Sequence, residues 1–89
     1  KMAFVKLTLV GNSPQPIEVE MPGATAWHRA AQRCAEAIGM NPEGIHSDGH
    51  RYEWMLVKMP ERLVIHPDDP IGVIGDTEVE LVALKREAG

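Results

Sequence analysis

Cysteine, aromatic residues and net charge are all scarce in this 89-residue sequence. The single thiol, Cys34, cannot form an intramolecular disulfide, a cysteine-based zinc site or an iron–sulfur cluster. Nine Lys and Arg against thirteen Asp and Glu leave a formal net charge of −4, which offers no basic surface to a run of phosphates. We therefore expect no nucleic-acid partner, no metal and no other cofactor.

Long apolar runs and targeting patterns are also missing. No apolar stretch approaches the ~20 residues that a membrane-spanning helix needs. Residues 1–4 lack the basic and apolar blocks of a secretory signal peptide. From these two absences we expect a cytoplasmic protein with no membrane partner.

Length and composition favour one small globular domain over an enzyme with a deep cleft. Hydrophobic residues make up 44% of the chain and charged residues 25%, which is typical of a folded domain. A chain of this length buries only about 60–65% of its unfolded surface and so supports one core. No glycine-rich phosphate loop, catalytic triad or paired-carboxylate motif is present in the sequence. We therefore expect that the protein is not an enzyme.

Alternating apolar and polar residues at the start of the chain predict a β-hairpin. In residues 4–10 and again in residues 17–21, every second residue is apolar, which is the period of a half-buried strand. Residues 11–16, between the two strands, are a concentrated turn signal. The expected inward positions are Val5, Leu7, Leu9, Ile17, Val19 and Met21.

A helical period follows in residues 26–38. The apolar residues that share one face of this helix are Trp27, Ala30, Ala31, Cys34 and Ile38. Thr25 is the expected N-cap, because its hydroxyl can accept a hydrogen bond from a backbone N–H of the first turn. Gly39 suits the left-handed residue that ends a helix.

The rest of the chain predicts short strands and loops. Residues 41–50, rich in Pro, Gly, Ser and Asp, are expected to form a loop. We expect strands at residues 51–57 and 77–84, a very short strand at residues 63–65 and a single helical turn around residues 69–73.

The polar residues of the two longer strands set their expected faces. Glu53 marks the solvent face of the first, and Glu78 and Glu80 mark the solvent face of the second. The expected inward residues are Tyr52, Trp54, Leu56, Val79, Leu81 and Ala83. The apolar residues left facing outward are Met55, Val57, Val82 and Leu84.

The order of elements, a hairpin, a helix and then strands, is an α+β arrangement with one helix packed on a mixed four- to five-stranded sheet. A single helix lying across such a sheet is the β-grasp fold, in which the last strand can lie parallel beside the first. We expect residues 1–84 to form this domain. Residues 85–89 carry no apolar pattern and are expected to form a flexible tail.

Over nearly its whole length the chain resembles the ubiquitin-like protein family, and its bacterial members in particular. The resemblance lies in the opening hairpin, in a helix closed by Gly39 and in the Pro-Glu-Gly-Ile loop of residues 42–45. It continues in the Pro-Asp-Asp-Pro-Ile turn of residues 67–71 and in the Gly-Asp-Thr of residues 75–77. After the closing strand, two basic residues lead towards Gly89.

This resemblance implies a ubiquitin-like protein modifier. In such a modifier, an adenylating enzyme activates the carboxylate of Gly89 and transfers it to a cysteine as a thioester, from which it reaches a protein target. The implied partners are the activating enzyme, a conjugating enzyme, a peptidase homologue and the target. The residues implied in recognition of the tail are Lys85, Arg86, Glu87 and Ala88. Ala88 departs from the Gly-Gly end that is common in the family, although the chemistry itself needs only the last carboxylate.

Two other functions fit the same resemblance. The chain can be a non-conjugated adaptor subunit of a larger complex, or a sulfur carrier whose terminal carboxylate becomes a thiocarboxylate. Ubiquitin-like proteins usually dock partners on a sheet face. The outward residues Met55, Val57, Val82 and Leu84 are therefore expected to form one exposed docking patch on neighbouring strands.

The residues with reactive or metal-binding side chains favour structural roles. Cys34 lies on the apolar stripe of the expected helix, so we expect a buried small residue in place of a nucleophile. His46 and His50 flank Asp48, but a loop seldom holds an i, i+4 pair of ligands together. We expect these histidines to be exposed polar residues.

Overall fold

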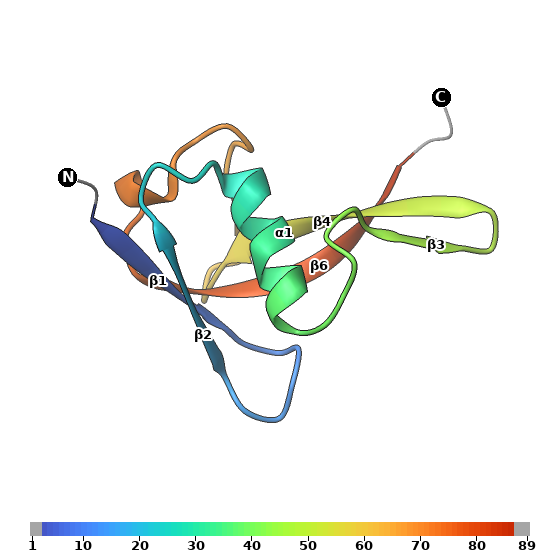
Figure 1. Ribbon diagram of the computed structural model, residues 1–89, viewed down its shortest axis with the longest axis horizontal. Coiled ribbons are helices and arrows are strands. Elements are labelled where there is room, and N and C mark those ends of the chain that lie inside the picture. Colours follow the sequence, from blue (N-terminus) through green and yellow to red (C-terminus); the bar gives the residue numbers. More distant parts are fainter. Residues whose placement is uncertain (1–2, 87–89) are drawn as a thin grey trace.

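The computed structural model describes residues 3–86 of the chain (Figure 1). Six strands and one α-helix follow each other with a single 3₁₀ turn, η1, before the last strand. Their bounds are β1 Phe4–Leu9, β2 Ile17–Pro22, α1 Trp27–Ala37, β3 Ile45–Ser47, β4 His50–Lys58, β5 Leu63–Val64, η1 Ile71–Val73 and β6 Thr77–Arg86.

The strands form one mixed sheet in the order β2-β1-β6-β4-β3. The sixth strand, β5, pairs with the other end of β4 from β3. The long last strand, β6, lies in the centre, parallel to β1 and antiparallel to β4. Helix α1 crosses one face of this sheet (Figure 1). The α+β arrangement expected from the sequence is therefore confirmed, and the sheet has six strands where four to five were expected.

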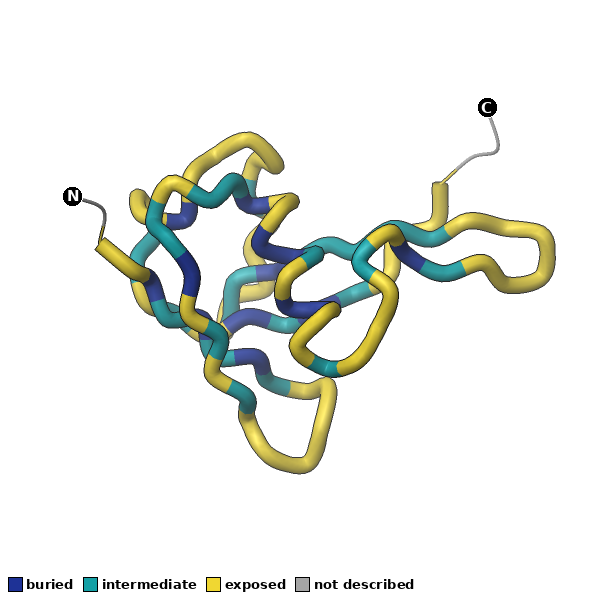
Figure 2. Tube along the Cα trace, viewed as in Figure 1, coloured by how far each residue is buried: buried dark blue, intermediate teal, exposed yellow. Residues whose placement is uncertain are grey.

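The opening hairpin follows its alternating pattern. β1 and β2 pair antiparallel, with Val5 opposite Met21 and Leu7 opposite Val19. The inward residues of β1 are buried, and those of β2 are buried or half-buried. The exposed turn between the strands stands out at the lower edge of Figure 2. Because the side-chain period of a strand is two, the sequence pattern was sufficient to place this register.

The N-terminus of α1 is held by a loop and not by the expected cap. Thr25 was expected to cap the helix, but the N-cap is Ala26, which provides no side-chain acceptor. The N–H of Trp27 instead donates to the carbonyl of Asp69 at 2.8 Å, and the next N–H donates to the carbonyl of Pro67 at 3.0 Å. The loop after β5 therefore satisfies donors that a cap would otherwise satisfy.

The C-terminus of α1 ends as the sequence predicts. Gly39 adopts a left-handed backbone with φ of +82°. Its N–H donates to the carbonyl of Glu36 at 3.0 Å, and the N–H of Met40 donates to the carbonyl of Ala35 at 2.9 Å. This pair of bonds is the Schellman motif, which a glycine at this position favours.

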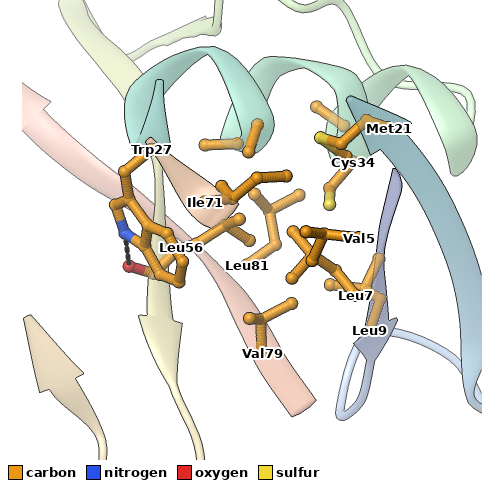
Figure 3. Close-up of a cluster of buried hydrophobic side chains, with 13 residues drawn as sticks. Val5, Leu7, Leu9, Met21, Trp27, Cys34, Leu56, Ile71, Val79 and Leu81 are labelled. Atoms are coloured by element: carbon orange, nitrogen blue, oxygen red, sulfur yellow. Dashed lines mark hydrogen bonds between the residues drawn. The ribbon is translucent and has the colours of Figure 1, made fainter. Parts of the chain in front are cut away.

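The core lies between α1 and the sheet (Figures 2 and 3). Its members from α1 are Trp27, Ala30, Ala31, Cys34 and Ala35, and its other members are Val5, Leu7, Leu9, Met21, Leu56, Ile71, Val79 and Leu81. Ile38, expected on the same face, is partly buried against this cluster. The indole N–H of Trp27 donates to the backbone carbonyl of Leu56 at 2.9 Å, as drawn in Figure 3. Helix and sheet are therefore joined by a buried hydrogen bond as well as by apolar contact.

Two side chains close the short parallel ladder between β1 and β6. That ladder has three residue pairs, from Leu7 opposite Thr77 to Leu9 opposite Val79. Beyond its far end, the side-chain amide of Asn12 accepts from the N–H of Leu81 and donates to the carbonyl of the same residue. Just before the first pair of the ladder, the carboxylate of Asp76 accepts a hydrogen bond of 2.9 Å from the backbone N–H of Lys6. Polar side chains thus continue the hydrogen bonding beyond both ends of this ladder.

The segment expected as a loop at residues 41–50 contains a strand, so that expectation was wrong. β3 pairs with the start of β4 through a tight turn at Asp48 and Gly49, whose φ angles are +54° and +75°. Positive φ at both central residues is typical of the two-residue turn that Asp-Gly favours. Gly44, just before β3, has φ of +108°, and a Cβ there would lie 2.0 Å from the carbonyl oxygen of Tyr52. Only glycine permits this close approach of two backbones.

The end of β6 also differs from expectation. The strand continues to Arg86, where a flexible tail was expected to begin at Lys85. Lys85 lies opposite Tyr52, and Arg86 lies opposite Arg51 of β4. Ala83, expected in the core, is exposed, because β6 has by then passed beyond the core. β6 therefore continues past the boundary expected at residue 84 to Arg86, and the rest of the expected tail, residues 87–89, lies outside the described residues.

The helix of the described region is short. α1 has 11 residues, and no helix within residues 3–86 is long and apolar enough to cross a membrane.

Candidate docking surface

The register of β4 and β6 brings the expected docking residues onto one face of the sheet. Met55 lies directly opposite Val82, and Leu84 lies two residues further along β6. Residues directly opposite each other in an antiparallel pair share a face. Because Leu56, next to Met55, packs in the core under α1, this face is the one turned away from the helix. We call it the outer face.

The four expected residues differ in exposure. Leu84 is 42% exposed, and Met55 and Val82 are half-buried. Val57 was expected in the exposed patch, but only 4% of it is exposed. Three of the four expected residues are therefore accessible on this face, and Val57 is covered.

One apolar residue of this face was not predicted. Val64 in β5 lies directly opposite Val57, so it belongs to the same face, and it is 71% exposed. β5 has only two residues, too few for alternation in the sequence to reveal which side faces out. We define the outer apolar patch as Met55, Val64, Val82 and Leu84.

Ion pairs flank the outer apolar patch on two sides. Beside Val57, Arg62 pairs with Glu80, the residue opposite Val57 on β6. At the other end, Glu53 pairs with Arg51 and also with Arg86, whose Nε lies 3.3 Å from a carboxylate oxygen. An apolar centre with a charged margin is the usual composition of a protein–protein interface.

The residues expected to be recognised in a tail are divided by the end of β6. Lys85 and Arg86 are held in the strand by pairing with β4, and Arg86 is also held by Glu53. Glu87, Ala88 and Gly89 lie outside the described residues. Recognition of Lys85 and Arg86 as free chain would therefore first require their separation from β4.

The residues with reactive side chains take the structural roles expected of them. Cys34 is fully buried, and burial raises the pKa of its thiol to about 12, so it remains protonated at neutral pH. His46 lies opposite Arg51, whereas His50 lies opposite Ser47, so the two imidazoles project to opposite faces of the hairpin. Within residues 3–86 no group of three His, Cys, Asp or Glu side chains is placed to hold a metal ion.

A further hollow at the surface of the described residues has no side chain suited to catalysis. It measures ≈ 570 Å³ and lies where β1 begins, beside η1. Its lining residues are Ala3, Val5, Gly23, Ala24, Pro70, Gly72 and Val73. None of these has a titratable or nucleophilic side chain, so this hollow offers no group for catalysis.

Comparison of the chain with protein-family models and with curated proteins finds no match.

Proposed function

We propose that this protein is a non-catalytic, ubiquitin-like β-grasp protein that docks a protein partner on its outer sheet face. The observation that carries the proposal is the register of β4 and β6, which aligns Met55 with Val82 and leaves Leu84 exposed beside them. Val64 extends the same apolar surface across β5. Exposed apolar residues gathered within a charged margin favour a protein partner.

The topology supports the β-grasp part of the proposal. A hairpin precedes the helix, and the last strand lies between the first strand and β4. It runs parallel to β1, as a crossover through the helix and the following strands requires. The helix covers the opposite face, which leaves the outer face available to a partner.

The adaptor function has one specific observation in its favour. Lys85 and Arg86 are paired with β4, and Arg86 also holds Glu53. An adaptor needs only a surface and leaves this part of the strand undisturbed. An activating enzyme that grips these two residues in an extended channel must instead break their pairing.

Conjugation through Gly89 is the more specific version of the proposal. In this chemistry the Gly89 carboxylate attacks the α-phosphate of ATP and releases pyrophosphate. A thiolate of the activating enzyme then displaces AMP to form a thioester, and an amine of the target displaces that thiolate. The sulfur-carrier function shares the first step but ends in a thiocarboxylate. All of this chemistry rests on the family resemblance and on residue 89.

The docking surface is tested by charge substitution in the patch. Val82→Asp places a carboxylate in the centre of the outer apolar patch without entering the core. A photo-crosslinker at Leu84 in the native host should capture one protein, and Val82→Asp should abolish this capture while far-UV circular dichroism remains unchanged. The control is Val73→Asp, which places the same charge on a valine that is 73% exposed in η1, outside the outer apolar patch. If Val82→Asp captures the same protein in the same yield, the outer face is not the docking surface.

The conjugation chemistry is tested separately at Gly89. Incubation with the cognate activating enzyme and ATP should yield an adenylate and then a thioester that a reducing agent reverses. Deletion of Gly89 should abolish both products and leave the melting temperature unchanged. If the truncated chain supports the same cellular activity as the full chain, the modifier and sulfur-carrier functions are both wrong and the adaptor function remains.

A further inference from the structure

One edge of β4 lacks a neighbouring strand over four residues. On its β6 side, β4 is paired from Arg51 to Lys58. On its other side, β3 pairs with residues 50–52 and β5 pairs with residues 57–58, so residues 53–56 lie between the two short strands. At ~3.4 Å per residue this gap is about 14 Å long, which is the length of a short extended peptide.

The backbone groups that face this gap follow from the alternation of an antiparallel ladder. Successive residues direct their N–H and C=O to opposite neighbours. The N–H of Met59 donates to Glu78 in the direction of β6, whereas the carbonyl of Leu56 accepts the indole of Trp27 on the other side. Trp54, two residues from Leu56, therefore directs both its N–H and its C=O into the gap. Neither group has a hydrogen-bond partner among residues 3–86.

Two hollows flank Trp54 along this edge. One, of ≈ 330 Å³, is lined by all four residues of the gap, by Trp27 of α1, by Val64 of β5 and by Leu84 and Arg86 of β6. The other, of ≈ 200 Å³, is lined by His28, Gln32, Pro42, Glu43, Arg51, Glu53 and Trp54. Consecutive strand residues point to alternate faces, so a hollow lined by four of them lies at the strand edge.

The charges along this groove balance. Arg51 and Arg86 both pair with Glu53, and Glu43 lies at the same end of the groove. The two hollows are thus lined by two guanidinium groups and two carboxylates, with no net charge to attract an ionic ligand. The other end, beside Met55 and Val64, is predominantly apolar.

We infer that the β4 edge is a second binding site, which takes an uncharged extended peptide as an added antiparallel strand between β3 and β5. The central residue of the peptide pairs with Trp54 through two hydrogen bonds, one in each direction. The preceding residue lies opposite Met55 and is apolar, whereas the following residue lies opposite Glu53 and is polar. Strand addition of this kind draws affinity from backbone bonds and selectivity from alternate side chains. The groove borders the outer apolar patch and shares Met55, Val64 and Leu84 with it, but the backbone pairing at Trp54 does not rest on the proposed docking on the outer face.

Amide hydrogen exchange tests the site directly. In the free protein the amide of Trp54 should exchange much faster than the amide of Met55, which faces β6. The probe is the peptide acetyl-Ser-Val-Val-Thr-Ser-amide, whose third residue is aligned with Trp54. With a Kd of ~0.1 mM, the peptide at ~1 mM should slow exchange of the Trp54 amide about tenfold. The same peptide N-methylated at its third residue cannot donate to Trp54 and should have no effect.

A matched pair of valines separates this site from non-specific binding. Val64→Lys places an ammonium beside the groove and should weaken binding about tenfold. Val73→Lys changes an equally exposed valine outside the groove and should leave binding unchanged. The proposal is overturned if the Trp54 amide is already as protected as that of Met55 in the free protein. It is equally overturned if the N-methylated peptide binds as well as the parent, or if both lysine variants behave alike.

Discussion

Trp27 joins helix and sheet by both packing and hydrogen bonding, so its substitution tests the core most directly. It lies at the first position of α1, is 1% exposed and donates its indole N–H to the carbonyl of Leu56 (Figure 3). Trp27→Ala removes a fully buried aromatic side chain and should lower the free energy of unfolding by about 3–5 kcal/mol. Small domains have a total stability of about 5–15 kcal/mol, so this variant can be largely unfolded.

Trp27→Phe separates the hydrogen bond from the packing. It keeps an aromatic ring but leaves the carbonyl of Leu56 buried without its donor, which costs about 1–3 kcal/mol. With the volume that phenylalanine leaves empty, we expect a total loss of about 2–4 kcal/mol. The control is Trp54→Phe, because Trp54 is only half-buried and donates to the carbonyl of Asn41 near the surface. Loss of that bond should cost about 1 kcal/mol.

The measurement is urea unfolding followed by far-UV circular dichroism, since loss of a tryptophan changes the fluorescence signal itself. Thermal unfolding should agree, at roughly 4–8 °C of melting temperature for each kcal/mol. A cost below about 1 kcal/mol for Trp27→Ala would show that α1 does not pack on the sheet through this residue. A larger cost for Trp54→Phe than for Trp27→Phe would contradict the assignment of the buried bond to Trp27.

Four further substitutions test other parts of the fold by urea unfolding. Gly44→Ala forces a Cβ onto a β4 carbonyl and should lower the free energy of unfolding by about 2–4 kcal/mol. Gly49→Ala, also at positive φ but in open space, should lower it by only about 1 kcal/mol. Equal losses in the two variants would contradict the close approach of the backbones at Gly44. Because burial raises the pKa of Cys34 from 9.0 to about 12, the unfolded thiol ionises first, and stability should fall by about 1 kcal/mol per pH unit above pH 9. Cys34→Ala should lack this component, and an identical pH profile would refute it. Asn12→Ala removes both bonds to Leu81 and should cost about 1–3 kcal/mol, while an unchanged midpoint would show that the ladder does not need them.

The outer face shows how far a strand pattern predicts a site. Glu78 and Glu80 placed Val82 and Leu84 outward, and the pairing with Met55 agrees with that register. The burial of Val57 was not predictable, because it depends on what surrounds the residue in space and not on its own alternation. Val64 was not predicted, because the two residues of β5 are too few for alternation to show which side chain faces outward.

The elements that needed tertiary information have few apolar residues of their own. β3 has little apolar pattern, and the Asp48-Gly49 turn was the one local signal that could have revealed it. Lys85 and Arg86 have the sequence of a free tail, although pairing with β4 holds them in the strand. The local sequence pattern does not show which distant residues a strand pairs with. The open edge at Trp54 likewise exists only because β3 and β5 stop short of each other.

The sequence by itself determined the features that depend on local pattern. These are the opening hairpin, the apolar stripe from Trp27 to Cys34, the helix end at Gly39 and the burial of the Cys34 thiol. These features depend on neighbours within a few residues, so the local pattern contains the necessary information. The tertiary structure decided how the helix begins, where β6 ends and which edge of the sheet stays open. Each of these outcomes depends on a backbone group meeting a partner from a distant part of the chain, as the N–H of Trp27 meets the carbonyl of Asp69.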